Sequence, residues 1–139
     1  MCIRDRFLDA KQTIFQNVFS TLDPSTGVVT YRQDILDQKI GEWLSSCPGP
    51  EGGHDWQATS YNAPTDLLII PESQSCVLMQ GHEVDMKLGG GGTAGSQQYF
   101  FMPGTHQNMG KLVAYRTNDM KEIWSFQQRS CLLYTSRCV

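Results

Sequence analysis

The chain has 139 residues and carries 11 lysines and arginines against 14 aspartates and glutamates, a formal net charge of −3 at pH 7. The basic residues form no cluster, which argues against a nucleic-acid groove or a surface for anionic membranes. No apolar run approaches the roughly 20 residues needed to cross a bilayer, so no membrane span is predicted.

The two ends of the chain are related at the level of DNA. One DNA sequence can encode residues 1–5, and its inverted copy can encode residues 131–136. Such inverted copies resemble the transposon ends used in sequencing-library preparation, so 1–6 and 131–139 are expected to be adaptor-derived tails. The genuine segment is then expected to be 7–130, encoded by an internal piece of a longer gene. This segment contains eight basic and thirteen acidic residues.

Most of the chain is predicted to form β-strands. Segments rich in β-branched and aromatic residues alternate with Pro, Gly and Asn, which favour turns. The strands are expected at about 13–20, 67–71, 76–79, 98–102, 111–116 and 121–127. The one helix candidate is 34–44, but its flanks carry no strong cap, so an irregular loop is an equal alternative.

Two segments look like copies of one hairpin unit. Residues 21–31 contain the turn Asp-Pro-Ser-Thr-Gly, in which Pro pre-sets φ, Asp bonds to the local backbone and Gly takes the left-handed position. Residues 114–124 repeat the pattern with a degenerate turn, in which Met120 stands in the place of Gly27. Repeated short hairpins are typical of propellers, sandwiches and solenoids.

Two of the five cysteines, Cys47 and Cys76, lie outside the expected tails. An even pair that flanks a compact segment predicts one disulfide and an oxidising compartment. Two alternatives stay open, a pair of buried thiols and a zinc site that adds His54 and His82. The zinc site is disfavoured because the spacing lacks the tight Cys-x2–4-Cys hairpin of structural zinc sites.

The segment between these cysteines carries the most specific pattern in the chain. It reads Cys47-Pro48, then Gly52-Gly53-His54-Asp55-Trp56-Gln57, Ser60-Tyr61-Asn62 and Leu67-Leu68-Ile69-Ile70-Pro71, and it closes at Cys76. This order resembles one piece of the pyrroloquinoline quinone (PQQ)-dependent, or quinoprotein, alcohol and methanol dehydrogenases. In that family a Cys-Pro, a Gly-Gly-x-(Asn/Asp)-Trp run and a Tyr-(Asn/Asp)-Pro-like turn precede a hydrophobic strand that ends in a second Cys.

The resemblance implies an all-β fold, a partial β-propeller of about two to three four-stranded blades from an eight-bladed quinoprotein propeller. The repeated hairpins resemble the tryptophan-docking motif of these propellers, with Trp124 in the docking position and Tyr31 as a substitute. On this basis the segment 7–130 is expected to be an internal fragment of such a propeller.

The resemblance also implies an activity. The parent protein is expected to be a periplasmic PQQ-dependent alcohol dehydrogenase that oxidises a small alcohol to the aldehyde or ketone and passes electrons to a c-type cytochrome. PQQ and a calcium or lanthanide ion are the implied cofactors. The catalytic base, the metal ligands and the vicinal cysteines of the family have no matching motif here, so the fragment alone is expected to be inactive.

By motif position, Asp55 is the residue that approaches the quinone carbonyls in the family, with Trp56 beside it, so both are predicted cofactor-binding residues. An ionised carboxylate cannot donate a hydrogen bond to a carbonyl oxygen. Asp55 would therefore have to be protonated, or be held by a neighbouring cation, in order to face the quinone. The alternative is that Asp55 caps a turn and only shapes the end of a blade.

Two other classes of function remain open. The first is a non-catalytic propeller of the cell envelope that acts as a binding or assembly scaffold, and the second is an unrelated secreted β-sandwich. The Gly-Gly-x-Asp-Trp run between paired cysteines favours the enzyme, because related scaffold propellers lack it.

Overall fold

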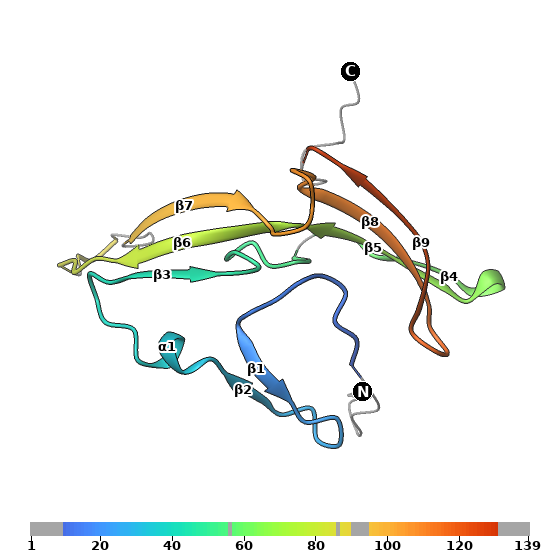
Figure 1. Cartoon of the computed structure of the whole chain (residues 1–139), viewed down its shortest axis with the longest axis horizontal. Coiled ribbons are helices and arrows are strands. Elements are labelled where there is room, and N and C mark those ends of the chain that lie inside the picture. The colour runs from blue at the N-terminus through green and yellow to red at the C-terminus, as the bar shows by residue number, and fades with distance from the viewer. Residues whose placement is uncertain (1–9, 56, 86, 90–94, 131–139) are drawn as a thin grey trace.

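The computed structural model describes residues 10–55, 57–85, 87–89 and 95–130, so the expected tails 1–6 and 131–139 lie outside the described residues (Figure 1). The regular secondary structure of the described part is almost entirely β, which confirms the predicted all-β class. Its strands are β1 (Phe19–Leu22), β2 (Val29–Tyr31), β3 (Trp43–Ser46), β4 (Ser60–Asn62), β5 (Leu67–Ser73), β6 (Ser75–Gly81), β7 (Gly95–Phe101), β8 (Gly110–Arg116) and β9 (Lys121–Gln128). Two short helices, α1 (Gln33–Leu36) and the 3-10 helix η1 (Ala63–Thr65), complete the set.

The strands form three antiparallel sheets. β1 and β2 make a hairpin, β3-β6-β7 a three-stranded sheet and β4-β5-β8-β9 a four-stranded sheet. β5 and β6 follow each other with only Gln74 between them, so the two larger sheets lie end to end along one long run of chain (Figure 1). The segment that joins β3 to β4 therefore runs beside the junction of the two sheets.

The strands expected from 67 to 127 are confirmed as β5 to β9, with shifts of a few residues at their ends. The expected strand at 13–20 is wrong except for its last two residues. The side chain of Gln16 accepts hydrogen bonds from the amides of Val18 and Phe19, at 2.9 and 2.8 Å, and so occupies backbone groups that a strand would pair.

The helix candidate 34–44 is also largely wrong. Only α1 is helical there, and Arg32 precedes it without a side-chain capping bond. Trp43 and Leu44 lie instead in β3, where they pair with Gln80 and Met79 of β6. Pairing with a distant strand has overridden the local helical pattern, as tertiary contacts commonly do.

The two hairpin units keep the same turn geometry. Gly27 has φ 75° and Met120 has φ 53°, so methionine adopts the left-handed conformation at the position where the first unit has glycine. In the first turn, Asp23 Oδ1 accepts a hydrogen bond from the amide of Ser25 at 2.8 Å, as its turn chemistry predicts. The repeat predicted from the sequence is therefore present in the backbone.

The apolar core of the described part is small. Its centre is formed by Cys47, Cys76 and Met102, against which Ile14 packs. Many large apolar side chains are exposed on the sheets, and Trp124 is 39% exposed on the edge strand β9. Its docking role between blades stays a prediction.

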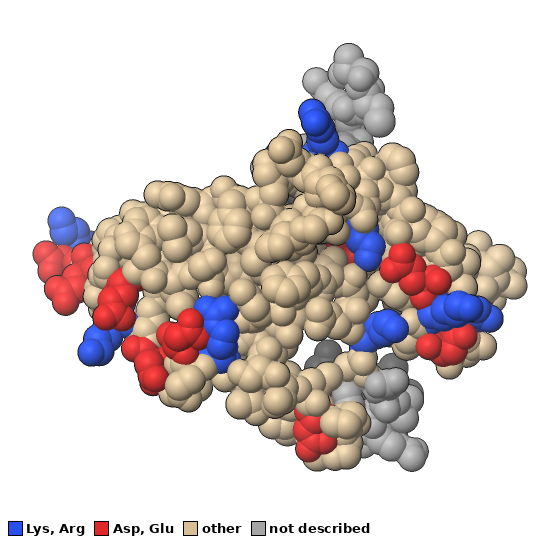
Figure 2. All heavy atoms as spheres, viewed as in Figure 1, with Lys and Arg blue, Asp and Glu red and all other residues tan. Residues whose placement is uncertain are grey.

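Charged side chains of both signs are gathered at the ends and along the lower side of the face shown in Figure 2. The part of that face over β6 and β7 carries few of them (Figures 1 and 2). Among the residues that the structure describes, no helix is long and apolar enough to cross a membrane.

Asp66 joins the turn after β4 to the turn between β8 and β9. It lies in the left-handed region, with φ 54°, and its carboxylate accepts hydrogen bonds from Thr117 Oγ1, from Tyr61 Oη at 3.1 Å and from the amide of Asn118 at 3.3 Å. The bond from Thr117 is the largest cause of a pKa for Asp66 below the ordinary value of 3.8.

This geometry predicts a loss of stability in acid. The pKa of Asp66 is lower in the folded state than in the unfolded state. Its full contribution to folding stability is therefore present above about pH 4 and is lost as the pH falls through the folded-state pKa. Asp66→Asn should therefore reduce the fall in thermal unfolding midpoint below about pH 4. The exposed Asp85→Asn variant should follow the wild type, and an identical acid profile for Asp66→Asn would contradict the prediction.

Candidate functional site

Cys47 and Cys76 form the predicted disulfide, with an S–S distance of 2.04 Å. Cys47 directly follows β3 and Cys76 lies in the neighbouring β6, and the two residues are 3% and 0% exposed. Because the two sulfur atoms are bonded to each other, the alternatives of two free thiols and of a zinc site are wrong. His54 Nδ1 lies 2.9 Å from the carbonyl oxygen of Pro71, and His82 Nε2 lies 2.8 Å from Ser96 Oγ.

The N-terminal segment is hydrogen-bonded to the backbone of Cys47. The amide of Asn17 donates to the carbonyl of Cys47 at 2.8 Å, and the amide of Cys47 donates to Asn17 Oδ1 at 2.7 Å. Ile14 then reaches the Gly-Gly run, because a Cβ added to Gly53 would lie only 2.4 Å from Ile14 Cδ1. The missing side chain at Gly53 therefore allows the N-terminal segment to pack against the loop.

The loop itself is fixed along the edge of the long β5–β6 run. The amide of Gly49 donates to the carbonyl of Ser75 at 2.9 Å, and the amide of Ser73 donates to the carbonyl of Gly53 at 2.7 Å. His54 adds a third bond, since Nδ1 must carry the proton to donate to the Pro71 carbonyl. These three bonds all involve loop residues that precede Asp55.

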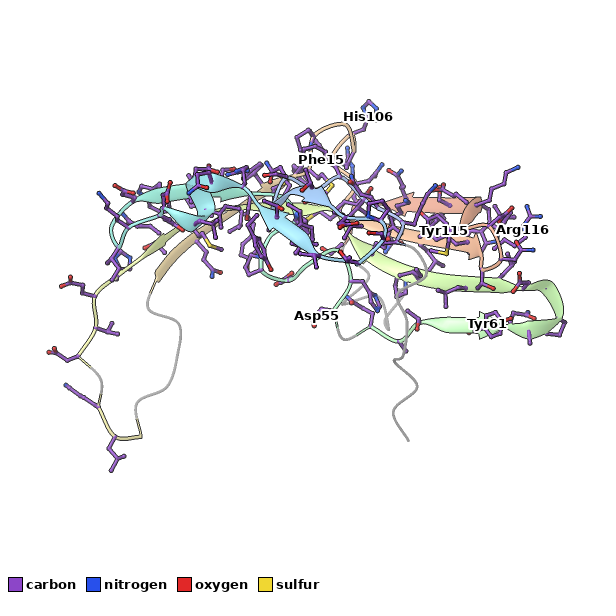
Figure 3. All side chains as sticks on the ribbon, turned by 90° about the horizontal axis from the view of Figure 1, so that it is seen from below. Phe15, Asp55, Tyr61, His106, Tyr115 and Arg116 are labelled. Atoms are coloured by element: carbon purple, nitrogen blue, oxygen red, sulfur yellow. A yellow bond between two sulfur atoms is a disulfide. The ribbon has the colours of Figure 1, made fainter. Side chains whose placement is uncertain are left out.

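Asp55 is exposed, and its backbone amide donates to Gln57 Oε1 at 3.1 Å. Its carboxylate has no hydrogen-bond or ion-pair partner among the residues that the structure describes. Figure 3 places Asp55 on the loop between β3 and β4, on the opposite side of the sheets from Phe15 and His106. The predicted neighbour Trp56 lies outside the described residues.

The exposed carboxyl group of Asp55 fits a ligand contact, because no protein group competes for it within the described part of the chain. The described residues contain no group of three or more His, Cys, Asp or Glu that could hold a metal ion.

Sequence reasoning missed a charge cluster on β5, β8 and β9, in which Glu72 and Lys111 are buried and Glu122 is exposed. Lys111 Nζ lies 3.4 Å from Glu72 Oε2 and 3.6 Å from Glu122 Oε2, and it donates to the carbonyl of Thr13 at 2.9 Å. Tyr115 Oη donates to Glu122 Oε2 at 3.4 Å. The signal for the cluster is the cross-strand pair of Glu72 and Lys111, whose opposite charges meet once the register of β5 and β8 is known.

Burial governs the electrostatics of this cluster. The Glu72 side chain is 1% exposed, and desolvation raises its pKa against the opposing effects of the Thr13 side-chain hydrogen bond and the Lys111 charge. Desolvation also raises the pKa of Tyr115 to about 12, with the Glu72 charge as the next cause. Burial thus shifts the pKa of both groups in the direction of the uncharged form.

Comparisons with known proteins agree with this fold. The dehydrogenase subunit of the quinone alcohol dehydrogenase of Acetobacter aceti is 38% identical over 68 residues, which cover 49% of this chain and 9% of that protein. The corresponding subunit of Gluconobacter oxydans is 33% identical over 82 residues, or 59% of this chain and 11% of that protein. No protein-family model matches the chain.

Solved structures extend the likeness to most of the chain. A europium-containing methanol dehydrogenase superposes with a TM-score of 0.77 at 17% identity, over 89% of this chain and 22% of that one. The quinohemoprotein alcohol dehydrogenase of Comamonas testosteroni gives a TM-score of 0.66 at 22% identity, over 90% and 19% of the two chains.

These likenesses define the fold as part of a quinoprotein β-propeller, with one four-stranded sheet, one three-stranded sheet and one hairpin in the described residues. With the sequence relatives, they confirm that the chain is related to the PQQ-dependent alcohol dehydrogenases and corresponds to a piece of their propeller. The chain spans about a tenth of the length of these curated relatives, 9% and 11% of the two proteins.

Proposed function

We propose that this chain is part of an alcohol dehydrogenase that uses PQQ to oxidise a small primary or other alcohol to the aldehyde or ketone. The observation that carries the proposal is the 38% identity to a quinone alcohol dehydrogenase subunit over 68 residues. When bound, PQQ would accept the hydride equivalent and a calcium or lanthanide ion would polarise it. A c-type cytochrome would then take the electrons. No observation favours the scaffold alternative over this enzyme.

Within the chain, Asp55 and Trp56 are the proposed cofactor contacts. The support for Asp55 is its position in the motif, its exposure and the absence of a carboxylate partner among the described residues. As a protonated acid, Asp55 would donate to a quinone carbonyl oxygen; as a carboxylate, it would need a cation between itself and that oxygen. The loop anchors at Gly53 and His54 would hold Asp55 in place for this contact.

The proposed location of the parent protein is the periplasm. The disulfide between Cys47 and Cys76 supports it, because such bonds persist in oxidising compartments.

The activity is tested on the longer protein that carries this segment. Dye-linked oxidation of small primary alcohols should require added PQQ together with calcium or a lanthanide, and the 139-residue chain alone should show none. A longer protein that neither binds PQQ nor oxidises alcohols with it would overturn the proposal.

The contact of Asp55 is tested by PQQ titration of the same protein freed of cofactor. Asp55→Ala should weaken PQQ binding about 10- to 100-fold, the range expected for one hydrogen bond to a charged or strongly polar group. Asp55→Asn should keep the affinity, because the amide group can donate a hydrogen bond to the same carbonyl oxygen. The exposed Asp85→Ala variant is the control, and wild-type affinity in Asp55→Ala would remove Asp55 from the site.

A further inference from the structure

β7 is the outer strand of the three-stranded sheet β3-β6-β7 (Figure 1). It pairs with β6 along all 7 of its residues, and its other edge pairs with no strand among the described residues. Every second residue of such an edge directs its amide and carbonyl groups away from the sheet. In the four-stranded sheet, β8 pairs with β5 as β7 pairs with β6, and β9 lies beyond β8. The place beside β7 is therefore one where this fold accepts a further strand.

The other sheet edges carry features that discourage pairing with another chain, and β7 does not. β1, β2, β3 and β4 have only 3 or 4 residues each. β9 begins with Lys121 and Glu122, and its pairing with β8 shifts register between Ala114 and Tyr115. Short strands, charged side chains and bulges are the usual protections of sheet edges. β7, by contrast, is regularly paired and contains no charged residue and no proline.

The side chains of β7 offer apolar surface on both faces of the sheet. Tyr99, Phe100 and Phe101 are 46%, 41% and 47% exposed. Tyr99 lies opposite Val77 of β6 and Phe100 opposite Cys76, so neighbouring rings point to opposite faces. The part of the surface over β6 and β7 carries few charged side chains (Figures 1 and 2). A strand added beside β7 would therefore cover aromatic rings on both of its faces.

A second copy of this chain is the partner that fits this edge. Because β7 has no charged residue, two β7 strands oppose no like charges in any register. The twofold antiparallel register that pairs every residue of β7 is centred on Gln98, which then lies opposite Gln98 of the second copy. Phe101 lies opposite Gly95 of the second copy, and an aromatic ring can cover an edge glycine in this way. A contact between β7 and β9 would instead leave an edge of each copy open for further copies.

We propose that β7 is a self-recognition edge, through which two copies of this chain pair as antiparallel strands and form one continuous six-stranded sheet. The sheet would run through β3, β6 and β7 of one copy into β7, β6 and β3 of the other. The pairing does not depend on the proposed alcohol dehydrogenase activity.

The aromatic surface sets the expected strength of the pairing. A fully buried Phe or Tyr side chain covers roughly 150–250 Å², so the exposed parts of the three rings amount to about 200–350 Å² per copy. Twice this area is below the roughly 1,200 Å² at which stable complexes begin. We therefore expect a weak, reversible dimer with a Kd on the order of 10–100 µM.

Sedimentation velocity of the 139-residue chain tests the pairing. Cys2, Cys131 and Cys138 are replaced by serine in every sample, so that these residues form no disulfide between copies. This background should change from monomer to dimer between about 1 and 500 µM. Gln98→Lys should raise the Kd about 3- to 10-fold, because two ammonium groups would face each other at the twofold axis. Gln98→Glu should do the same through two facing carboxylates.

An equal mixture of these two variants separates the contact from any effect on folding. Opposite charges then face each other at position 98, so the mixed dimer should recover at least the affinity of the background. A misfolded chain would not regain the contact in this way. Ile123→Lys is the matched control, because Ile123 is 44% exposed on the competing edge strand β9. This variant should dimerise as the background does.

Hydrogen exchange shows what occupies the edge. The β7 amides that point away from β6 should exchange more slowly at about 500 µM than at about 5 µM. If the chain stays monomeric while these amides are protected at every concentration, a segment of the same chain covers β7 and the proposal is wrong. It is also overturned by a monomer with unprotected β7 amides, by assemblies larger than a dimer, or by a mixture that associates no better than Gln98→Lys alone. Equal weakening by Ile123→Lys and Gln98→Lys would have the same meaning.

Discussion

Replacing Cys47 and Cys76 together by alanine is expected to lower the free energy of unfolding by about 3–4 kcal/mol. The bond joins residues 29 positions apart, and the chain-entropy account gives this magnitude for a closed loop of that length. Both residues also belong to the small apolar core with Met102 and Ile14, so the replacement leaves a packing defect as well.

Guanidinium unfolding measures this change, in a background in which Cys2, Cys131 and Cys138 are replaced by serine to prevent disulfide exchange. That background is the matched control, and it should differ from the unmodified chain by less than about 0.5 kcal/mol. Adding a reductant should remove most of the stability difference between the background and the double alanine variant. Equal stability of the two proteins under oxidising conditions would contradict the stabilising role of the bond.

The parts of the fold that local chemistry determines could be predicted from the sequence. β5 and β8 contain apolar and β-branched runs, at 67–70 and 112–113, and the predicted bounds of both strands differ from the observed ones by at most two residues. The turn that ends at Gly27 needs a residue with positive φ, and its Asp-Pro-Ser-Thr-Gly sequence predicts this. In the second hairpin Met120 adopts the same left-handed conformation although it is not glycine. Pattern and turn chemistry point to the same answer in these elements.

The secondary-structure predictions that are wrong concern segments whose conformation depends on contacts with residues distant in sequence. Trp43 and Leu44 fit an apolar helical spacing, yet their partners in β6 begin more than 30 residues later in the sequence. In the same way, the strand expected at 13–20 is replaced by an irregular segment bonded to Cys47 and Lys111. No local pattern contains this information.

The residues of the candidate site also fall into two groups, those that a local sequence pattern predicts and those that only the strand register reveals. Asp55 and the disulfide were found because a motif and a cysteine pair are visible in one short segment. The pair of Glu72 and Lys111 depends on the register between β5 and β8, which a long intervening segment with β6 and β7 conceals. A buried ion pair across strands can be recognised only after the strands are aligned.

Replacing Lys111 by methionine is expected to destabilise the protein by about 3–5 kcal/mol near neutral pH, the range for removing one partner of a buried ion pair. The Lys111 side chain is 10% exposed, and methionine can fill most of its volume. The loss would come from the Glu72 charge and the Thr13 carbonyl, which both lose their partner Nζ.

The double variant Lys111→Met, Glu72→Gln separates charge from packing. If the uncompensated carboxylate causes the loss, the double variant should recover most of it in denaturant unfolding, because the buried negative charge is gone. The single variant should also lose less at about pH 5 than at about pH 8, since the raised pKa of Glu72 favours its neutral form at the lower pH. Lys121→Met on the exposed edge of β9 should change stability by less than about 0.5 kcal/mol. A double variant as unstable as the single one would show that Lys111 acts through packing, and that charge pairing with Glu72 does not hold the N-terminal segment in place.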